Sequence, residues 1–276
     1  MKTTNRLFSA IVVLLLLLNT TTIFAQEDAP AGPEYVTVTT MHWNMDLEDF
    51  KMDEWKATEK EYMDKVTKKN EHVMAAGFYL HRITPDNREL VYVQAYANWN
   101  AIDLAAKRND ELAKEAWADE DERKAFLKKQ GNYYSPFHSD EIYATMPLAK
   151  SLSEDPKKDM IVYLRTSHFA FPEDGSYKEF MDTFTEYTEN VTHKNEYVKA
   201  YYPMNHAYGS DKTEFVEAFF LDSLADLDKK FDKDGELFDA HWSTEEAKKE
   251  MGKIGDKYFT GVHGDAIYTV VPELRK

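Results

Sequence analysis

The stretch VTKKNEHV, residues 66–73, returns later in the same chain as VTHKNEYV, residues 191–198. The likeness extends well beyond this phrase, because residues 55–147 align with residues 180–272 without a gap. Self-similarity over such a length indicates an internal duplication, and two copies of this size are too few and too long for a solenoid. We therefore expect one folding unit to be present twice.

Both copies show the same order of predicted elements. The first copy reads as a strand, a helix, a β-hairpin, a helical region and a last strand, at 35–43, 49–69, 75–98, 101–129 and 138–147. We expect the helical region to break near Asn109-Asp110, where the second copy has Asp234-Gly235. The order β-α-β-β-α-β predicts an α+β, ferredoxin-like unit with four antiparallel strands ordered 4-1-3-2 and both helices on one face.

One such unit leaves the other face of its sheet bare, and an apolar face needs cover. The arrangement resembles the dimeric α/β-barrel superfamily, in which two such sheets pack face to face. Here two ferredoxin-like βαββαβ repeats would form that pair within one chain, as an intramolecular dimeric α/β-barrel. The resemblance rests on element order and duplication, and it transfers no catalytic residue. Members of that superfamily include cofactor-independent oxygenases, haem-handling enzymes and proteins of unknown role, so the resemblance implies no single activity.

The start of the chain is typical of an export signal. Lys2 and Arg6 precede the apolar run IVVLLLLL, residues 11–18, which is too short to span a bilayer. We expect cleavage after Ala25 and a secreted or periplasmic protein, with an uncleaved membrane anchor as the alternative. The predicted organisation is a signal peptide, an N-terminal linker, repeat 1, a polar linker and repeat 2, at 1–25, 26–34, 35–148, 149–159 and 160–276.

Composition excludes several classes of partner and site. The chain has 50 acidic and 34 basic residues, a net charge of −16, and such a surface repels nucleic acid and anionic lipid. It has no cysteine, which excludes disulfides, thiolate metal sites and a cysteine nucleophile. We expect a small-molecule partner, no nucleic acid, and no membrane once the signal is removed. The repeats are expected to pair within the chain, and further oligomers stay open.

Histidines and a glutamate recur at the strand ends. In the predicted sheet, strands one and two end at the edge where strands three and four begin. The positions that fall on this edge in the two repeats are His42, His81, Glu89, His138, His168, His206, Glu214 and His263. Imidazoles with a carboxylate suit Zn, Fe or Cu, and they also suit acid–base work near neutral pH.

A transition metal is the cofactor option that these histidines leave open. A metal site would use His42 and His138 with Glu89 or Asp140, or the equivalent His168 and His263 in repeat 2. The competing interpretation is structural: such residues also cap strand ends and hydrogen-bond within their own loops.

Aromatic residues mark a second candidate site, between sheet and helices. The residues that would line such a pocket are Trp43, Trp117, Tyr133, Phe169, His241, Trp242 and Tyr258. A cavity lined by these rings suits a flat, apolar and aromatic ligand, although for Trp117 and Trp242 plain core packing is the favoured interpretation. His241 has Ala116 as its counterpart, so repeat 2 is the copy to test first.

No motif names an activity. The chain lacks a phosphate-binding loop, a dinucleotide glycine pattern, HExxH and a nucleophile elbow. The sequence therefore favours an exported small-molecule-binding protein with a pocket between sheet and helices. The alternative is an enzyme, either metal-dependent through the edge histidines or a cofactor-independent oxygenase acting in the pocket. A third option is a structural or interaction protein of the cell envelope.

Overall fold

The duplicated sequence folds as two matching runs of strands and helices, in a computed structural model that describes residues 32–156 and 158–276. The signal peptide expected at 1–25 lies outside the described residues. The residues from Pro33 to Lys276 form one compact unit. In the described part of the chain, no helix is long and apolar enough to cross a membrane.

The elements follow the predicted order twice. Repeat 1 contains β1 (Tyr35–Trp43), α2 (Met52–Lys65), β2 (Ala75–Ile83), β3 (Glu89–Tyr96), α3 (Trp99–Ala116), α4 (Glu120–Gly131) and β4 (Tyr134–Thr145). Repeat 2 contains β5 (Ile161–Phe169), α5 (Tyr177–Tyr187), β6 (Ala200–Tyr208), β7 (Glu214–Leu221), α6 (Leu224–His241), α7 (Glu245–Tyr258) and β8 (Phe259–Arg275). The domain boundaries expected at 149–159 stay a prediction.

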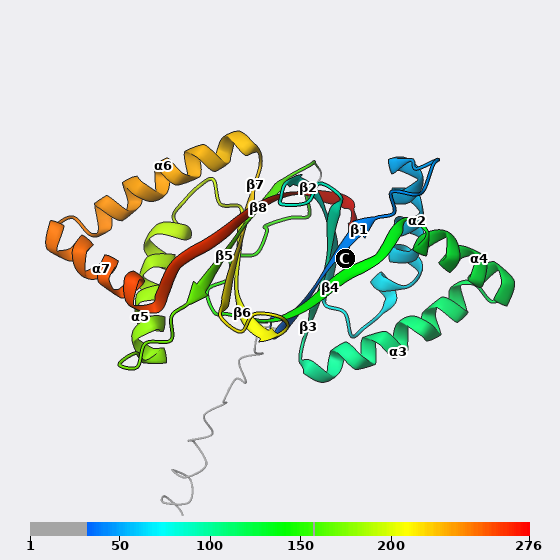
Figure 1. Ribbon diagram of the computed structural model, residues 1–276, viewed down its shortest axis with the longest axis horizontal. Coiled ribbons are helices and arrows are strands. Elements are labelled where there is room, and N and C mark those ends of the chain that lie inside the picture. The colour runs from blue at the N-terminus through cyan, green and yellow to red at the C-terminus, as the bar shows by residue number, and fades with distance from the viewer. Residues whose placement is uncertain (1–31, 157) are drawn as a thin grey trace, which may run out of the picture. The chain divides into compact units, whose positions relative to one another are not determined.

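The eight strands close into one antiparallel barrel in the order β1-β3-β2-β8-β5-β7-β6-β4. Within each repeat this is the predicted order 4-1-3-2. The two sheets join through β2 with β8 and β4 with β6, which leaves no free sheet edge in the described barrel. The fold is thus α+β, of the dimeric α/β-barrel type. Helices α2, α3 and α4 cover one side of the barrel, and α5, α6 and α7 cover the other (Figure 1).

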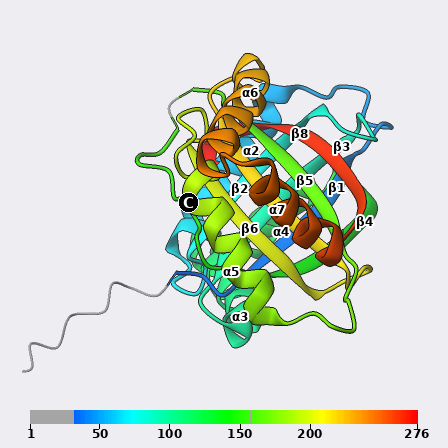
Figure 2. The same ribbon diagram turned by 90° about the vertical axis from the view of Figure 1, so that its left-hand side faces the viewer.

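Strand alternation divides the apolar residues between two kinds of core. One face of each strand fills the barrel interior, where Val36, Val93, Val162 and Val216 pack together. The opposite face packs under the helices, and Figure 2 shows α5, α6 and α7 lying over their half of the barrel. A large cluster forms there on each side of the barrel, and a smaller one around Trp117 lies between the helices of repeat 1. Any pocket between sheet and helices therefore belongs to a single repeat.

The repeated phrase ends the first helix of each repeat and anchors it. Asn70 and Asn195 are fully buried, and each donates two side-chain hydrogen bonds to the long helix that follows the hairpin. The acceptors are the backbone carbonyl of Ala105 or Lys230, and the side chain of Asn109 or Asp234. The phrase is thus a connection between two helices.

The helix breaks expected at Asn109-Asp110 and at Asp234-Gly235 were wrong. Helix α3 continues to Ala116 and α6 to His241, because Asn109 and Asp234 serve as half-buried acceptors for the buried asparagines of the repeated stretch. The helices end instead at Trp117 and Trp242, whose backbones leave the helical conformation while their rings stay buried. The side chains of Asp119 and Thr244 then cap the next helices.

Candidate functional site

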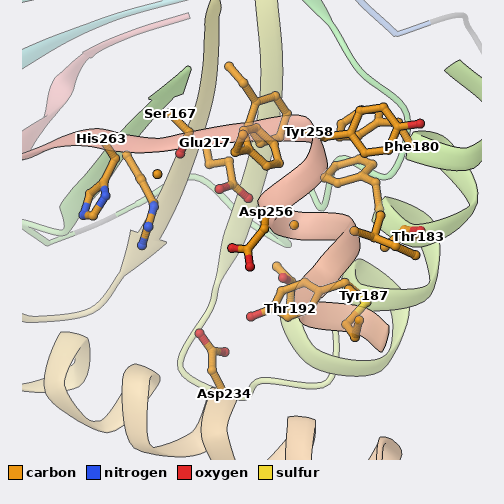
Figure 3. Close-up of a pocket in the computed structure, with 18 of the residues that line it drawn as sticks. Ser167, Phe180, Thr183, Tyr187, Thr192, Glu217, Asp234, Asp256, Tyr258 and His263 are labelled. Carbon is orange, nitrogen blue, oxygen red and sulfur yellow. The ribbon is translucent and has the colours of Figure 1, made fainter. Parts of the chain in front are cut away.

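A cavity of about 550 Å³ lies between the sheet and the helices of repeat 2 (Figure 3). Strands β5 and β7 form its floor, and α5, α6, α7 and the start of β8 form its walls. Its apolar lining is largely aromatic, with the rings of Phe180, Phe184, Phe215, Phe219, Phe231 and Phe259. We call it the repeat 2 cavity.

Two oppositely charged residues, Arg165 and Glu217, lie side by side on the floor of this cavity. Arg165 on β5 and Glu217 on β7 are direct cross-strand partners, so their side chains leave the sheet on the same face. The Glu217 Oε1 atom also accepts a hydrogen bond of 2.6 Å from the hydroxyl of Tyr201, a fully buried residue. The carboxyl group is therefore held in place at the bottom of an aromatic cavity.

A second charged pair comes from α6. The Nζ atom of Lys230 lies 2.7 Å from the Asp234 carboxylate, and 7% of the Lys230 side chain is exposed. The same ammonium lies 4.3 Å above the ring of Phe219 and 4.8 Å from that of Phe231, within the range of cation–π attraction. A buried cation thus stands beside the floor, fixed by one carboxylate and two rings.

Burial changes the acidity of these groups. Desolvation raises the pKa of Glu217, although its hydrogen bond from Tyr201 and the nearby charges of Lys230 and Arg165 oppose that rise. Desolvation and the charge of Glu217 hold the pKa of Tyr201 well above its ordinary value. A carboxyl group with a raised pKa is suited to accept and return a proton near neutral pH.

The opposite end of the cavity meets solvent. Asp256 on α7, with Val262 and His263 at the start of β8, line the cavity and are exposed. In Figure 3 the carboxyl groups of Glu217, Asp234 and Asp256 point into the same space. The cavity therefore has a buried polar floor, an aromatic middle and an open polar mouth.

Repeat 1 does not reproduce this floor. The counterparts of Glu217, Lys230 and Asp234 are Tyr92, Ala105 and Asn109. A smaller cavity of about 150 Å³ lies between the sheet and the helices of repeat 1. Both repeats therefore have the same fold, but the charged residues Glu217, Lys230 and Asp234 occur in repeat 2.

Among the residues predicted to line a pocket, Tyr258 lines the repeat 2 cavity. Phe169 is not among the described lining residues, but its ring stacks on that of the lining residue Phe259 with the centroids 5.2 Å apart. His241 instead lies 2.9 Å from the carboxylate of Glu186, and it is not among the described lining residues.

The other predicted pocket residues belong to the core. Trp43 packs edge-on against Trp55 at 5.0 Å, and Tyr133 is buried in the same cluster of repeat 1. Trp117 stacks on Phe126 and Trp242 contacts Phe238, so plain core packing accounts for both tryptophans.

The edge residues divide between the two faces of the sheet. His42 and Glu89 are cross-strand partners whose side chains share the barrel side. His138 instead pairs with Met41, whose side chain packs under the helices. The structure therefore does not bring His42 and His138 together. His168 and His263 are separated in the same way, because His263 pairs with Ser167, which lines the repeat 2 cavity.

Most edge histidines have local partners. The Nε2 atoms of His138 and His263 lie 3.2 and 3.3 Å from Asp140 and Asp265, two residues along their own strands. In the turns, His42 lies near Asp86, His81 near Thr84, and His168 near Asp211 and Thr213. His206 differs, because its Nε2 atom is buried without a hydrogen-bond partner among the described residues. No group of three or more potential metal ligands occurs in 32–156 and 158–276.

The edge glutamates connect the two repeats inside the barrel. Glu89 accepts a hydrogen bond of 2.9 Å from the hydroxyl of Tyr268, and Glu214 accepts one of 2.7 Å from Tyr143. Each glutamate thus pairs with a tyrosine of the other repeat. These contacts stabilise barrel closure, which is a structural role.

Sequence reasoning missed the charged floor of the repeat 2 cavity. Arg165 and Glu217 each lie within a largely apolar strand, and Lys230 lies on a helix already rich in charge. A signal was nevertheless present. Aligning the two repeats shows three positions of this floor at which only repeat 2 is charged. Arg165, Glu217 and Lys230 replace the uncharged Thr39, Tyr92 and Ala105 of repeat 1.

Comparisons with known proteins find solved structures of similar fold at low sequence identity. No protein-family model and no curated protein matches the chain. A putative monooxygenase from Fusobacterium nucleatum is 13% identical, with a TM-score of 0.56, and the match covers 88% of this chain and 94% of the other. An anthrone oxidase-like protein is 11% identical, with a TM-score of 0.50 and coverage of 88% and 93%.

A chlorite dismutase variant from Candidatus Nitrospira defluvii is 13% identical, with a TM-score of 0.51 and coverage of 88% and 92%. At such low identities these similarities show a shared fold, and the activity has to be inferred from the residues of the site itself.

Proposed function

We propose that the chain is an enzyme that binds a flat, mainly apolar small molecule in the repeat 2 cavity and removes a proton from it. The observation that carries this proposal is the placement of a half-buried and desolvated carboxyl group, Glu217, beneath an aromatic cavity of about 550 Å³. The volume suits a ligand of two or three fused rings. The likeness of the fold to a putative monooxygenase and to an anthrone oxidase-like protein supports an enzyme over a protein that only binds its ligand.

The chemistry follows from the groups on the floor. Glu217 takes a proton from an acidic methylene of the ligand, and the cationic groups of Arg165 and Lys230 stabilise the resulting anion. The electron-rich carbanion then reduces O₂ directly. One oxygen atom becomes the new carbonyl oxygen and the other leaves as water, so that CH₂ + O₂ gives C=O + H₂O. This is the cofactor-independent oxygenase alternative raised by the sequence.

Haem, which some members of the superfamily handle, does not fit the residues present. Among the described lining residues the one imidazole is His263, which is exposed at the mouth. The neighbouring charge at the mouth is the carboxylate of Asp256, which would repel haem propionates. We therefore derive no step through haem.

The test uses dithranol, a dihydroxyanthrone with an acidic methylene between two rings. Incubation with the purified chain is expected to consume one O₂ for each quinone formed, followed with an oxygen electrode and by absorbance. Glu217→Gln should lower the rate at least 100-fold and leave dithranol binding within about threefold, because the amide keeps the shape but cannot accept the proton.

Glu89→Gln is the matched control, since Glu89 is a buried carboxyl that likewise accepts from a tyrosine, far from the cavity. It should retain the wild-type rate. Binding of dithranol without oxygen uptake would restore the simpler binding-protein hypothesis. If neither binding nor uptake occurs, the proposal is wrong for this class of ligand.

We further propose that the chain is exported and that its first 25 residues are removed. The apolar run at 11–18 and the basic residues before it support this proposal. The mass of the chain recovered from its native host should correspond to a start at Gln26. A mass that includes Lys2 would instead support an uncleaved anchor.

A further inference from the structure

The smaller cavity, in repeat 1, has a different chemical character. It occupies about 150 Å³ between the sheet and α2, and we call it the repeat 1 cavity. Its described lining includes one carboxyl group, that of Glu59, and the amide of Gln130. Four aromatic rings surround them: Tyr62, Phe78, Tyr92 and Tyr134. None of these described residues is a lysine or arginine, in contrast to the repeat 2 cavity.

Glu59 is the ionisable acid of this cavity, and 3% of the residue is exposed. Its Oε1 atom accepts a hydrogen bond of 2.5 Å from the Tyr134 hydroxyl, and its Oε2 atom accepts one of 2.9 Å from Gln130. Both donors are neutral, so they orient the carboxyl group without neutralising it. A buried carboxylate without a cation is costly, and desolvation accordingly raises the pKa of Glu59.

The rings around Glu59 are held in fixed positions. Phe78 and Tyr92 stack with their centroids 4.4 Å apart. The Nε1 atom of Trp55 donates a hydrogen bond of 2.8 Å to the Tyr134 oxygen, which leaves the Tyr134 proton directed to Glu59. Aromatic faces carry negative electrostatic potential and attract cations. The rings and the carboxyl group therefore favour positive charge in the same small space.

We propose that the repeat 1 cavity binds a small alkylammonium cation between Glu59 and the rings of Tyr62, Tyr92 and Tyr134. The volume admits a nitrogen with a few methyl groups and excludes fused aromatic rings. The cation supplies the positive charge that Glu59 lacks, and its methyl groups pack on the ring faces. In repeat 2 the counterpart of Glu59 is Phe184, so this site belongs to repeat 1. The inference is independent of the function proposed for repeat 2.

Titration calorimetry of the full chain with trimethylammonium chloride tests this site, with tert-butanol as an uncharged ligand of similar shape. The cation is expected to bind at least tenfold more tightly. Its affinity should also rise from about pH 5 to about pH 8, because binding favours the ionised carboxyl group and expels its proton. The tyrosines that face Glu59 stay neutral over this range, since burial raises the pKa of Tyr62 to about 12 and also raises the pKa of Tyr92 and of Tyr134.

Glu59→Gln should weaken trimethylammonium binding at least tenfold, and Glu89→Gln should leave it unchanged. If Glu59→Gln does not fold, the pH dependence and the comparison with tert-butanol in the unaltered protein still decide the matter. Equal affinity for the two ligands, or an affinity that does not change with pH, overturns the proposal. Undiminished binding by a folded Glu59→Gln variant overturns it as well.

Discussion

The side-chain amide of Asn195 donates a hydrogen bond of 2.7 Å to the carboxylate of Asp234, and that carboxylate holds the Lys230 ammonium at 2.7 Å. Asn195 belongs to the repeated phrase, whereas Asp234 and Lys230 line the repeat 2 cavity. In repeat 1 the equivalent bond joins Asn70 to the neutral Asn109. The same connection between helices thus holds the charged residues of the floor in repeat 2, whereas in repeat 1 it joins two neutral side chains.

Removing this connection should affect the two repeats differently. Asn195→Ala and Asn70→Ala are each expected to lower the free energy of unfolding by about 2 kcal/mol, because each removes two buried hydrogen bonds. Asn195→Ala should also weaken dithranol binding at least threefold, since Asp234 loses a donor. Urea denaturation and fluorescence titration measure both effects. Equal losses of ligand binding in the two variants would contradict the proposed link to the floor.

The buried ammonium of Lys230 and the carboxylate of Asp234 should depend on each other for stability. Lys230→Ala leaves the half-buried Asp234 carboxylate without its cation, and it should cost about 2 kcal/mol of unfolding free energy. The double variant Lys230→Ala/Asp234→Asn installs the residues found at Ala105 and Asn109, so it should recover at least half of that loss in thermal denaturation. The double variant should nevertheless remain inactive with dithranol. Recovery of oxygen uptake would show that Lys230 is not needed for the reaction.

The sequence predicted the fold well because the relevant signals are repeated and local. Alternation in the strands, the apolar stripe of the first helix and the duplicated order of elements led to the strand order 4-1-3-2 seen in both repeats. The helix breaks were misplaced because Asn109 and Asp234 resemble helix-ending residues until their long-range partners are known. The helix propensity of a residue contains no information about the hydrogen bonds that it forms with residues distant in the sequence.

The candidate sites were predicted less well for a related reason. Edge topology located the histidines correctly, but the face on which His138 points depends on the register with Met41, which the sequence does not contain. The cavity was expected between sheet and helices, yet its floor depends on Glu217 and Lys230 meeting across β7 and α6. Such convergence follows from packing rather than from spacing.

Stability should fall as pH rises above the ordinary glutamate pKa of 4.5, owing to the buried carboxyl groups. Burial raises the pKa of Glu217 and Glu59 in the folded state, so the unfolded chain loses these protons first and is favoured by higher pH. Glu217→Gln should flatten the decline in stability above this ordinary pKa, as measured by chemical denaturation at a series of pH values.

Glu179→Gln is the control of opposite sign for this pH dependence. The hydrogen bond from Lys257 lowers the pKa of Glu179, so its contribution is present above the ordinary pKa and is lost as pH falls below it. This variant should change the profile on the acid side alone. A Glu217→Gln profile parallel to that of the unaltered protein would contradict the prediction.

The seam between β4 and β6, which closes the barrel, depends on one glycine. Gly209 has φ +150°, and a Cβ atom there would lie 1.3 Å from Oε2 of Glu141. That carboxylate accepts hydrogen bonds from the backbone nitrogen and the hydroxyl of Ser210, at 3.0 and 2.9 Å. Gly209→Ala should therefore lower the free energy of unfolding by about 1 to 2 kcal/mol, through backbone strain and the displaced carboxylate.

Glu141→Ala separates these two causes. It removes the clash and the hydrogen bonds together, so adding Gly209→Ala should then cost only the backbone strain, about 1 kcal/mol. Gly264→Ala in β8 is the matched control, because a Cβ atom there meets no atom within 4 Å, and it should leave the thermal midpoint unchanged or slightly raised. Strictly additive losses for Gly209→Ala and Glu141→Ala would mean that the two residues do not interact across the seam.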